Sequence, residues 1–368
     1  MKAMVLAAGK GTRLLPLTGE IPKPMAPIVG KPMIQHIFEL LAGSGVDETH
    51  INVFHLAESI LACYGERSQV EGMLVNVSRE ERLMGTAGGV KRLADRFDET
   101  FVVVMGDALT DIDVGKLTAF HKECKALATL ALMPVSDTSQ YGVVRLDGEG
   151  NILAFQEKPD PKEAISTLAN TGIYVLEPRV LEYIPENTFF DFANDLFPRL
   201  LEAGEKFVGY RGDFYWSDVG TLEAYRVAQS DVLAEKVRVR IPGERFRENL
   251  WIDEDAWFHR TTTLEGPVVL GRNTVIEQEV TLSGTVIVGA GCRVHSGATV
   301  TTSVLLPGSR VGSGAYLEGC IVGPRYDVRP GKRVRGKALS HSAPMDRALE
   351  PQPEHILEAP VPLPQVVS

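Results

Sequence analysis

An apolar residue recurs at every sixth position from residue 264 onward, and this period limits the fold more strictly than any other feature of the sequence. The residues at this position are Leu264, Leu270, Ile276, Leu282, Val288, Val294 and Val300. The fifth residue of each hexad is small or β-branched: Val268, Thr274, Val280, Val286, Cys292, Ala298 and Val304. We expect one slip, an insertion around Leu305–Pro307, after which the pattern resumes at Val311 and Leu317. The repeat predicts a left-handed parallel β-helix of about four coils, with about 18 residues in each three-sided coil.

The first two-thirds of the chain has a different pattern, in which strands and helices alternate. Strands are expected near 2–9, 50–55, 73–80 and 100–109, and helices near 32–45, 57–67 and 87–97. This alternation predicts an α/β fold with a mostly parallel, Rossmann-like sheet covered by helices on both faces. Ligands of such folds bind outside the carboxyl ends of the strands. Gly9 and Asp107 both follow a strand, so we expect them to share one site.

These patterns divide the chain into four parts. Residues 1–232 form the α/β domain, 233–263 a connector, 264–336 the β-helix and 337–368 a proline-rich tail that we expect to be poorly ordered.

Charge and composition exclude several classes of protein. The formal net charge of −10 argues against nucleic-acid and anionic-membrane partners, which select a basic surface. The sequence has no apolar run of the length that a membrane span requires. The four cysteines are far apart and form no CxxC pair, which favours a reduced, cytoplasmic setting over disulfides or a zinc site.

The loop Gly9-Lys10-Gly11-Thr12-Arg13 has the composition of an anion-binding turn. Two glycines let backbone N–H groups point inward, and Arg13 adds a planar fork that matches phosphate oxygens. The loop is not a P-loop, because Gly-Lys is followed by glycine. It is not a dinucleotide fingerprint either, because position 14 is leucine. The second mismatch disfavours an NAD-dependent dehydrogenase.

Further motifs accompany this loop: "PKP", "LMGTAGGV", "MGDALTD", "QYGVV", "FQEKP", "NTGIY" and "YWSDVGT". In this order and at this spacing they resemble the sugar-nucleotide pyrophosphorylases, the nucleotidyltransferases that act on sugar 1-phosphates. The resemblance covers residues 1–233, and an appended hexapeptide helix is common in the family. The chain is most similar to the mannose-1-phosphate guanylyltransferases, and uridylyl- and thymidylyltransferases acting on glucose 1-phosphate are close relatives. The base and the sugar epimer stay open.

The resemblance implies transfer of a nucleotidyl group from a nucleoside triphosphate to a sugar 1-phosphate, with release of pyrophosphate. Arg13 would hold the β- and γ-phosphates, Lys23 the phosphates near the reacting centre, and Lys158 the phosphate of the sugar. Asp107 and Asp218 would bind Mg²⁺, which favours few carboxylates together with phosphate oxygens and water. Asp111 and Asp113 are nearby rivals that we expect to start a helix.

The resemblance also assigns binding residues around these five groups. The nucleotide would contact Leu6, Ala8, Gly9, Gly11, Thr12, Arg13, Lys23 and Gly85. The sugar phosphate would contact Gly142, Glu157, Lys158 and Asn170. One departure lies beside the base, since Arg82, Leu83 and Met84 stand where guanylyltransferases commonly have Glu-Pro-Leu.

Two other functions remain as alternatives. A catalytically silent regulatory paralogue would keep the fold and lose the charged residues, which are all present here. An acyltransferase built on the β-helix would need a general base, and His295 is the histidine of the hexad run. We expect instead that the β-helix assembles the chain into a homo-oligomer.

Overall fold

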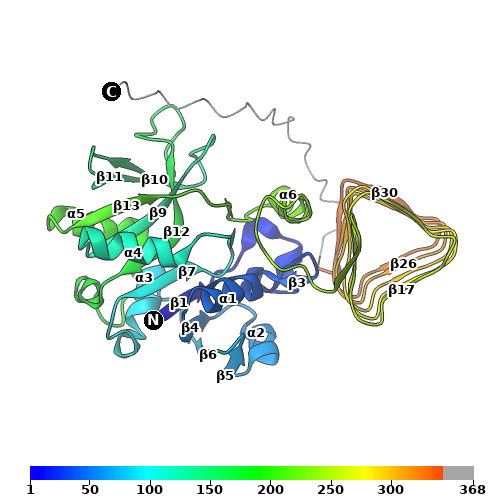
Figure 1. The fold of residues 1–368 in the computed structure, drawn as a ribbon, viewed down its shortest axis with the longest axis horizontal. Helices are drawn as coiled ribbons and strands as arrows, with labels where there is room; N and C mark the ends of the chain where they lie inside the picture. Colours follow the sequence, from blue (N-terminus) through cyan, green and yellow to red (C-terminus); the bar gives the residue numbers. More distant parts are fainter. Residues whose placement is uncertain (343–368) are drawn as a thin grey trace.

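The computed structural model describes residues 1–342, and residues 343–368, most of the predicted tail, lie outside the described part. A ten-stranded sheet organises the first two-thirds of the chain, and a three-sided stack of short parallel strands follows it (Figure 1). Both parts of the predicted architecture, a parallel-stranded α/β core and a C-terminal β-helix, are confirmed.

Four parallel strands form the centre of the N-terminal half of the sheet. They lie in the order β6 (Met73–Arg79), β4 (Glu48–Val53), β1 (Lys2–Ala7) and β7 (Phe101–Met105). Alternate residues of β1 enter different hydrophobic clusters, Met4 on one face and Val5 on the other. Side chains alternate across a strand, so a strand that is apolar at every position is buried on both faces.

The other half of the sheet is antiparallel, which the sequence analysis did not predict. Strand β12 (Leu168–Leu176) pairs antiparallel with β7 and with β9 (Ala128–Pro134). Strands β10 (Gly142–Leu146) and β11 (Ile152–Glu157) form a hairpin, whose short turn allows only antiparallel pairing. Two edge strands complete the sheet, β13 (Phe207–Arg211), parallel to β9, and β5 (Arg67–Val70), antiparallel to β6.

Helices cover both faces. Apolar side chains of α1 (Met33–Gly43), α2 (Ala57–Tyr64) and α4 (Val114–Cys124) pack on one face. Those of α3 (Thr86–Lys91) and α5 (Phe197–Glu202) pack on the other. Short elements lie between them: the 3-10 turns η1 (Thr12–Leu14), η2 (Leu17–Gly19), η3 (Lys23–Met25), η4 (Ala94–Arg96) and η5 (Pro178–Tyr183), the π-helix η6 (Phe192–Leu196), and the strands β2 (Pro27–Ile28), β3 (Lys31–Pro32), β8 (Leu109–Thr110) and β14 (Trp216–Ser217).

The two rival aspartates have different structural roles. Asp113 caps α4, where its carboxylate accepts the Lys116 N–H at 2.9 Å, as expected. Asp111 does not start a helix: its carboxylate accepts the backbone N–H groups of Tyr215 at 2.7 Å and Arg238 at 3.0 Å. It therefore fastens the connector to the α/β domain.

The β-helix begins one coil before residue 264. Its coils run from β16 (Leu250–Ile252), and Ile252 and Phe258 extend the six-residue period in the direction of the N-terminus. One sheet contains β16, β19 (Val268–Leu270), β22 (Val286–Val288), β25 (Val304–Leu305), β28 (Ile321–Val322) and β31 (Ala338–Leu339), with β15 (Glu244–Arg247) antiparallel at its edge. We call it the docking sheet.

The other two sheets have five strands each. One contains β17 (Trp257–Phe258), β20 (Val275–Ile276), β23 (Arg293–Val294), β26 (Arg310–Val311) and β29 (Asp327–Val328). The other contains β18 (Thr263–Glu265), β21 (Thr281–Ser283), β24 (Thr299–Thr301), β27 (Tyr316–Glu318) and β30 (Arg333–Arg335).

The predicted insertion at Leu305–Pro307 is wrong, because the slip is a shortening. Leu270 pairs with Val288, 18 residues later, whereas Val288 pairs with Leu305, 17 residues later. One residue is lost at the corner between β24 and β25. Residues 301–302 at this corner take the place of residues 283–285 in the preceding coil. Later coils keep the shorter length.

The docking sheet packs against the α/β domain. Its outward-facing residues Trp251, Val269, Ile287, Val304, Ile321 and Ala338 belong to one buried cluster with residues of the α/β domain. That cluster includes Leu14 and Leu17 from the segment between β1 and β2 (residues 8–26), which we call the opening loop. It also includes Tyr225 from α6 (Leu222–Leu233), which Figure 1 shows beside the β-helix. The β-helix is therefore part of the hydrophobic core under the opening loop.

Candidate active site

The opening loop leaves β1 at Ala7 and turns back on itself at Gly11. Gly11 has φ +61°, and a Cβ there would lie 2.9 Å from the Lys23 Cβ, so only glycine fits without displacement. A Cβ at Gly9 would meet no atom within 4 Å, so this side of the loop is open. The close approach at Gly11 places Lys23 directly against the loop.

Two adjoining cavities lie at the carboxyl ends of the central strands. The first, about 330 Å³, is lined by Leu6, Ala7, Ala8, Gly9, Gly11, Lys23, Pro24, Asn52, Glu80, Leu83, Gly85, Thr86, Met105, Asp107, Phe189 and Asp191. The second, about 310 Å³, is lined by Arg13, Lys23, Thr86, Met105, Asp107, Ala108, Gln140, Tyr141, Gly142, Glu157, Lys158, Asn170, Thr171, Gly172, Tyr174, Asp191, Phe192, Ala193, Trp216 and Asp218. Both cavities are lined by Lys23, Thr86, Met105, Asp107 and Asp191, so they meet around these residues.

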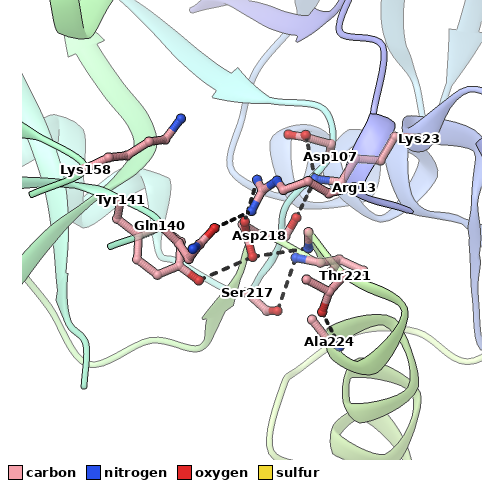
Figure 2. A network of polar contacts seen from close by, with 12 residues as sticks. Arg13, Lys23, Asp107, Gln140, Tyr141, Lys158, Ser217, Asp218, Thr221 and Ala224 are labelled. Carbon is pink, nitrogen blue, oxygen red and sulfur yellow. Dashed lines mark hydrogen bonds and ion pairs between the residues drawn. The ribbon is translucent and has the colours of Figure 1, made fainter. Parts of the chain in front are cut away.

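Charged side chains from distant segments converge where the cavities meet (Figure 2). Lys23 Nζ donates to Asp107 Oδ2 at 2.7 Å and to the carbonyl oxygen of Asp218 at 2.7 Å. Arg13 donates to Asp218 Oδ2 at 3.3 Å and to Gln140 Oε1 at 3.3 Å. Lys23 is only 5% exposed, so these oxygens take the place of the water that its ammonium group would otherwise contact.

The Asp218 carboxylate is held from several sides. Besides Arg13, its Oδ1 accepts the Tyr141 hydroxyl at 3.4 Å and the Gly220 N–H at 3.2 Å. A Cβ at Gly220 would lie 2.6 Å from Asp218 Oδ2, so a side chain there would displace the Asp218 carboxylate. Burial and the neighbouring Asp218 charge raise the pKa of Tyr141 to about 12, so Tyr141 stays a hydrogen-bond donor near neutral pH.

The predicted sugar-phosphate residues line the second cavity. Lys158 Nζ lies 3.5 Å from Glu157 Oε1, and the Lys158 side chain is otherwise open to the cavity. Burial raises the pKa of Glu157 above the ordinary glutamate value. Asn170 is fixed by its amide, which donates to the Tyr174 hydroxyl at 3.0 Å, and by its Oδ1, which accepts the Gly172 N–H at 3.0 Å.

Asp107 and Asp218 both line the second cavity, and the Lys23 ammonium group contacts the carboxylate of Asp107 and the backbone carbonyl oxygen of Asp218. Within residues 1–342 no cluster of three or more His, Cys, Asp or Glu side chains is arranged to hold a metal ion. Mg²⁺ favours few carboxylates together with phosphate oxygens and water, so a cavity lined by these two carboxylates has suitable ligands for it.

The structure brings the five predicted catalytic side chains to one place. Arg13, Lys23, Asp107, Lys158 and Asp218 all line the second cavity, together with Gly142, Glu157 and Asn170. Leu6, Ala8, Gly9, Gly11 and Gly85 line the first. Two predicted nucleotide contacts lie elsewhere: Thr12 lines neither cavity, and the Arg13 side chain turns to the second. Their functional roles remain predictions.

Sequence reasoning missed two polar groups of the first cavity. Glu80 is 3% exposed, and its carboxylate accepts the Asn52 amide at 2.8 Å and the Met84 N–H at 3.3 Å. Asn52 accepts the Ala7 N–H at 3.0 Å through Oδ1. Glu80 follows strand β6, so the strand-end rule that located Asp107 would have found it too, whereas Asn52 lies inside β4.

Thr86 and Asp191 were also missed. The Thr86 hydroxyl donates to Asp191 Oδ2 at 2.8 Å and accepts the Phe192 N–H at 2.9 Å. These bonds join the start of α3, next to Gly85, to η6. Asp191 precedes a helical segment and caps it, a signal that is visible in the sequence.

His295 lies away from both cavities, on the β-helix. Its Nδ1 is 2.9 Å from Glu277 Oε1, and Glu277 Oε2 also accepts the Ser296 hydroxyl at 3.0 Å. These contacts explain His295 as part of a corner of the coil.

A parallel-core α/β domain with a docked β-helix, and with a cleft lined by Arg13, Lys23, Lys158 and several carboxylates, has the architecture of a nucleotidyltransferase. The chain belongs to the nucleotidyl transferase family, whose model matches residues 2–235. A second model, the GMPPB C-terminal domain, matches residues 264–343. In the described part of the chain, every helix is too short or too polar to cross a membrane.

Curated relatives are named for different substrates. A UTP–glucose-1-phosphate uridylyltransferase of Synechocystis sp. is 41% identical over 89% of this chain and 88% of its own. A mannose-1-phosphate guanylyltransferase of Mycobacterium tuberculosis is 33% identical over 86% of this chain and 82% of its own. Among solved structures, HddC from Yersinia pseudotuberculosis complexed with GMP-PN matches 63% of this chain and 99% of its own, with a TM-score of 0.54 and 26% identity.

Proposed function

We propose that this chain transfers a nucleotidyl group from GTP to mannose 1-phosphate, releasing pyrophosphate. The observation that carries the reaction class is the convergence of Arg13, Lys23, Lys158 and two carboxylates on adjoining cavities. The first cavity would hold the base and ribose, and the second would hold the sugar phosphate together with the nucleotide phosphates that contact Arg13. The α-phosphorus would lie between them, beside Lys23 and Asp107.

The reaction joins two anions, so the main task of the protein is alignment and charge neutralisation. A phosphate oxygen of the sugar substrate attacks the α-phosphorus, and the bond from this phosphorus to the pyrophosphate oxygen breaks. Arg13 and Lys23 hold the phosphates of the nucleotide, and Lys158 holds the phosphate of the sugar. Before substrates bind, Asp218 and Asp107 keep Arg13 and Lys23 in place through the ion pairs described above.

Mg²⁺ is the proposed cofactor, with Asp107 and Asp218 as its protein ligands. When bound, it would supply charge that offsets the build-up on the departing pyrophosphate.

Glu80 favours guanine as the base. Its carboxylate lines the first cavity, and it can accept two parallel hydrogen bonds from the N1–H and N2–H groups of guanine. Uracil offers a single N–H donor between two carbonyl oxygens, which would face the carboxylate unfavourably. Asn52 and Met84 each occupy one acceptor position on the Glu80 carboxylate, so guanine would use the remaining lone pairs of the two oxygens.

A second substrate pair is supported by a different observation. The 41% identity to the Synechocystis sp. enzyme favours UTP and glucose 1-phosphate. The stretch Arg82-Leu83-Met84 replaces the Glu-Pro-Leu that guanylyltransferases commonly have at these positions. It lies beside the first cavity, and Leu83 lines that cavity.

Pyrophosphate release should be measured with GTP, UTP, dTTP and ATP, each with mannose 1-phosphate and glucose 1-phosphate, with and without Mg²⁺. We expect the highest kcat/KM for GTP with mannose 1-phosphate, and no turnover without the metal. A preference for UTP with glucose 1-phosphate would establish the second pair. Absence of turnover with every substrate pair would favour the alternative function, a catalytically silent regulatory paralogue.

Glu80→Gln tests how the base is selected. Glutamine keeps the size of the side chain and replaces one acceptor oxygen with a donor, so we expect the ratio of kcat/KM for GTP to that for UTP to fall about tenfold or more. The matched control is Glu81→Gln, which changes the exposed neighbouring glutamate. An unchanged ratio in Glu80→Gln would contradict guanine recognition by this carboxylate.

We also propose that copies of the chain associate through the β-helix, in the cytoplasm. Strands β17 and β18 lie at sheet edges at one end of the stack, and Trp257 on β17 is 50% exposed. An open edge with an aromatic side chain suits association with a second copy. The four cysteines are free, as a reducing compartment allows. Light scattering of the full chain tests the assembly, and the mass of a single chain would contradict it.

A further inference from the structure

The C-terminal end of the β-helix contacts the loop between Arg13 and Lys23, the two cations proposed to bind the nucleotide. Glu20 lies in this loop, and its Oε1 accepts the Ser340 hydroxyl, the Ser342 N–H at 3.3 Å and the Ser342 hydroxyl at 3.4 Å. The Ser342 hydroxyl is also 3.1 Å from the carbonyl oxygen of Pro16, which can accept its proton. Residues more than 300 positions apart in the chain are thus joined by several hydrogen bonds.

The contact is close as well as polar. A Cβ at Gly19 would lie 2.7 Å from the Ser342 hydroxyl oxygen, so the backbone of the loop lies directly against the serine. Leu17, in the same loop, is fully buried in the cluster that contains the outward face of the docking sheet. The loop is therefore fixed by apolar packing along one side and by Ser342 at one end.

This loop connects to both cations of the proposed nucleotide site. Arg13 precedes it in η1, and Lys23 follows it in η3. Within the loop, the Thr18 hydroxyl donates to the Gly11 carbonyl oxygen at 2.8 Å, which ties it to the glycine turn. A shift of residues 16–20 would therefore move the glycine turn and both cations relative to Asp107 and Asp218.

We propose that Ser342 and Glu20 are positioning residues, which hold the opening loop in the conformation that binds the triphosphate. The inference rests on the proposed role of residues 9–13 and Lys23 in nucleotide binding. Neither Ser342 nor Glu20 lines the cavities, so their effect is indirect. When only a fraction of molecules has the competent loop, the apparent affinity for the nucleotide falls by that fraction.

The experiment compares Ser342→Ala, Glu20→Ala, Glu20→Gln and the double variant Ser342→Ala/Glu20→Ala in the full chain. Glutamine retains an acceptor oxygen for both serines, so it serves as the conservative variant. The matched control is Ser313→Ala, at an exposed corner of another coil. Binding of GTP and of UTP is measured by calorimetry with Mg²⁺, and KM and kcat are measured for both substrates, with Tm for each variant.

We expect Ser342→Ala and Glu20→Ala to raise the Kd and KM for the nucleotide about fivefold or more, with kcat and the KM for the sugar phosphate within about twofold. Glu20→Gln and Ser313→Ala should match the wild type. The effects of Ser342→Ala and Glu20→Ala should be less than additive in the double variant, because the two residues share a contact, although Ser342 also contacts the Pro16 carbonyl oxygen.

Unchanged nucleotide binding in both alanine variants would overturn the proposal. An equal loss for both substrates with a lowered Tm would also overturn it, since that pattern indicates general destabilisation. The wild type separates this result from failure of the proposed function: if the wild type binds neither GTP nor UTP, the proposed function fails, whatever the variants do.

Discussion

Lys23 shows how much of the site depends on a single buried side chain. Its ammonium nitrogen contacts the carboxylate of Asp107 and the backbone of Asp218, and its Cβ lies against Gly11. The sequence predicted these charges as a set, because each occurs in a recognisable motif. It did not predict that Gln140 holds Arg13, since that contact joins residues 127 positions apart and neither motif specifies it.

Asp107→Asn should reduce kcat by about a hundredfold or more, because it removes a proposed metal ligand and the charge partner of Lys23 while keeping the shape of the side chain. Pyrophosphate release at increasing Mg²⁺ concentration measures this effect, and half-maximal activation should move to higher concentration. Asp95→Asn, at an exposed aspartate, is the control. Near-normal kcat in Asp107→Asn would remove Asp107 from the metal site.

Glu157 should make binding of the sugar phosphate sensitive to acid. Burial raises its pKa above the ordinary 4.5, so it takes up a proton earlier than an exposed glutamate as the pH falls. The protonated form is a weaker acceptor for sugar hydroxyls, so the KM for the sugar phosphate should rise between pH 7 and pH 5. Glu157→Gln should have a higher KM at pH 7 and a flatter profile. Ionisation of the sugar phosphate affects the wild type and Glu157→Gln equally. Parallel dependence of KM on pH in the two proteins would therefore contradict this role of Glu157.

At the scale of elements, the sequence predicted the strands that obey a simple period. The parallel core follows from the alternation of apolar strands and helices, and the coil register from the hexads up to Val300. The antiparallel half of the sheet has no such signal, because pairing direction depends on connections between elements. The docking sheet did carry a signal: 268–270 and 286–288 are apolar at three consecutive positions, which indicates burial on both faces.

Ile287→Ala tests whether the β-helix belongs to the catalytic core. Ile287 points outward from the coil yet is 1% exposed, so we expect a loss of about 2–4 kcal/mol in the free energy of unfolding. Activity should fall as well, because Ile287 shares a cluster with Leu14 beside Arg13. Denaturant titration and turnover measure both. Thr299→Ala, on an outward position of another sheet, should change stability by less than about 0.5 kcal/mol.

At the scale of the whole molecule, buried histidines should make stability fall in acid. Burial lowers the pKa of His36 from 6.5 to about 4, and burial also lowers the pKa values of His50 and His121. The unfolded chain then binds more protons than the folded chain as pH falls below 6.5, so the free energy of unfolding decreases toward pH 4. His36 alone contributes up to about 3 kcal/mol to this decrease.

Tm measured from pH 7 to pH 4.5 checks this prediction. His36→Gln keeps a donor for the Ile28 carbonyl oxygen, which lies 3.1 Å from Nε2, and should give a shallower decline. His341→Gln, at an exposed histidine, is the control. Equal slopes for His36→Gln and the wild type would show that His36 does not control the acid response.

Every parallel strand of the docking sheet, from β16 to β31, contributes a residue to the hydrophobic cluster shared with the α/β domain, and this has a consequence for the length of the β-helix. A free-standing repeat protein tolerates gain or loss of a unit, because each unit touches only its neighbours. Here each added or deleted coil would also carry Ser342 away from Glu20 by the spacing of one strand. The number of coils is therefore matched to the height of the domain beside it, and chimeras that exchange β-helices should preserve that number.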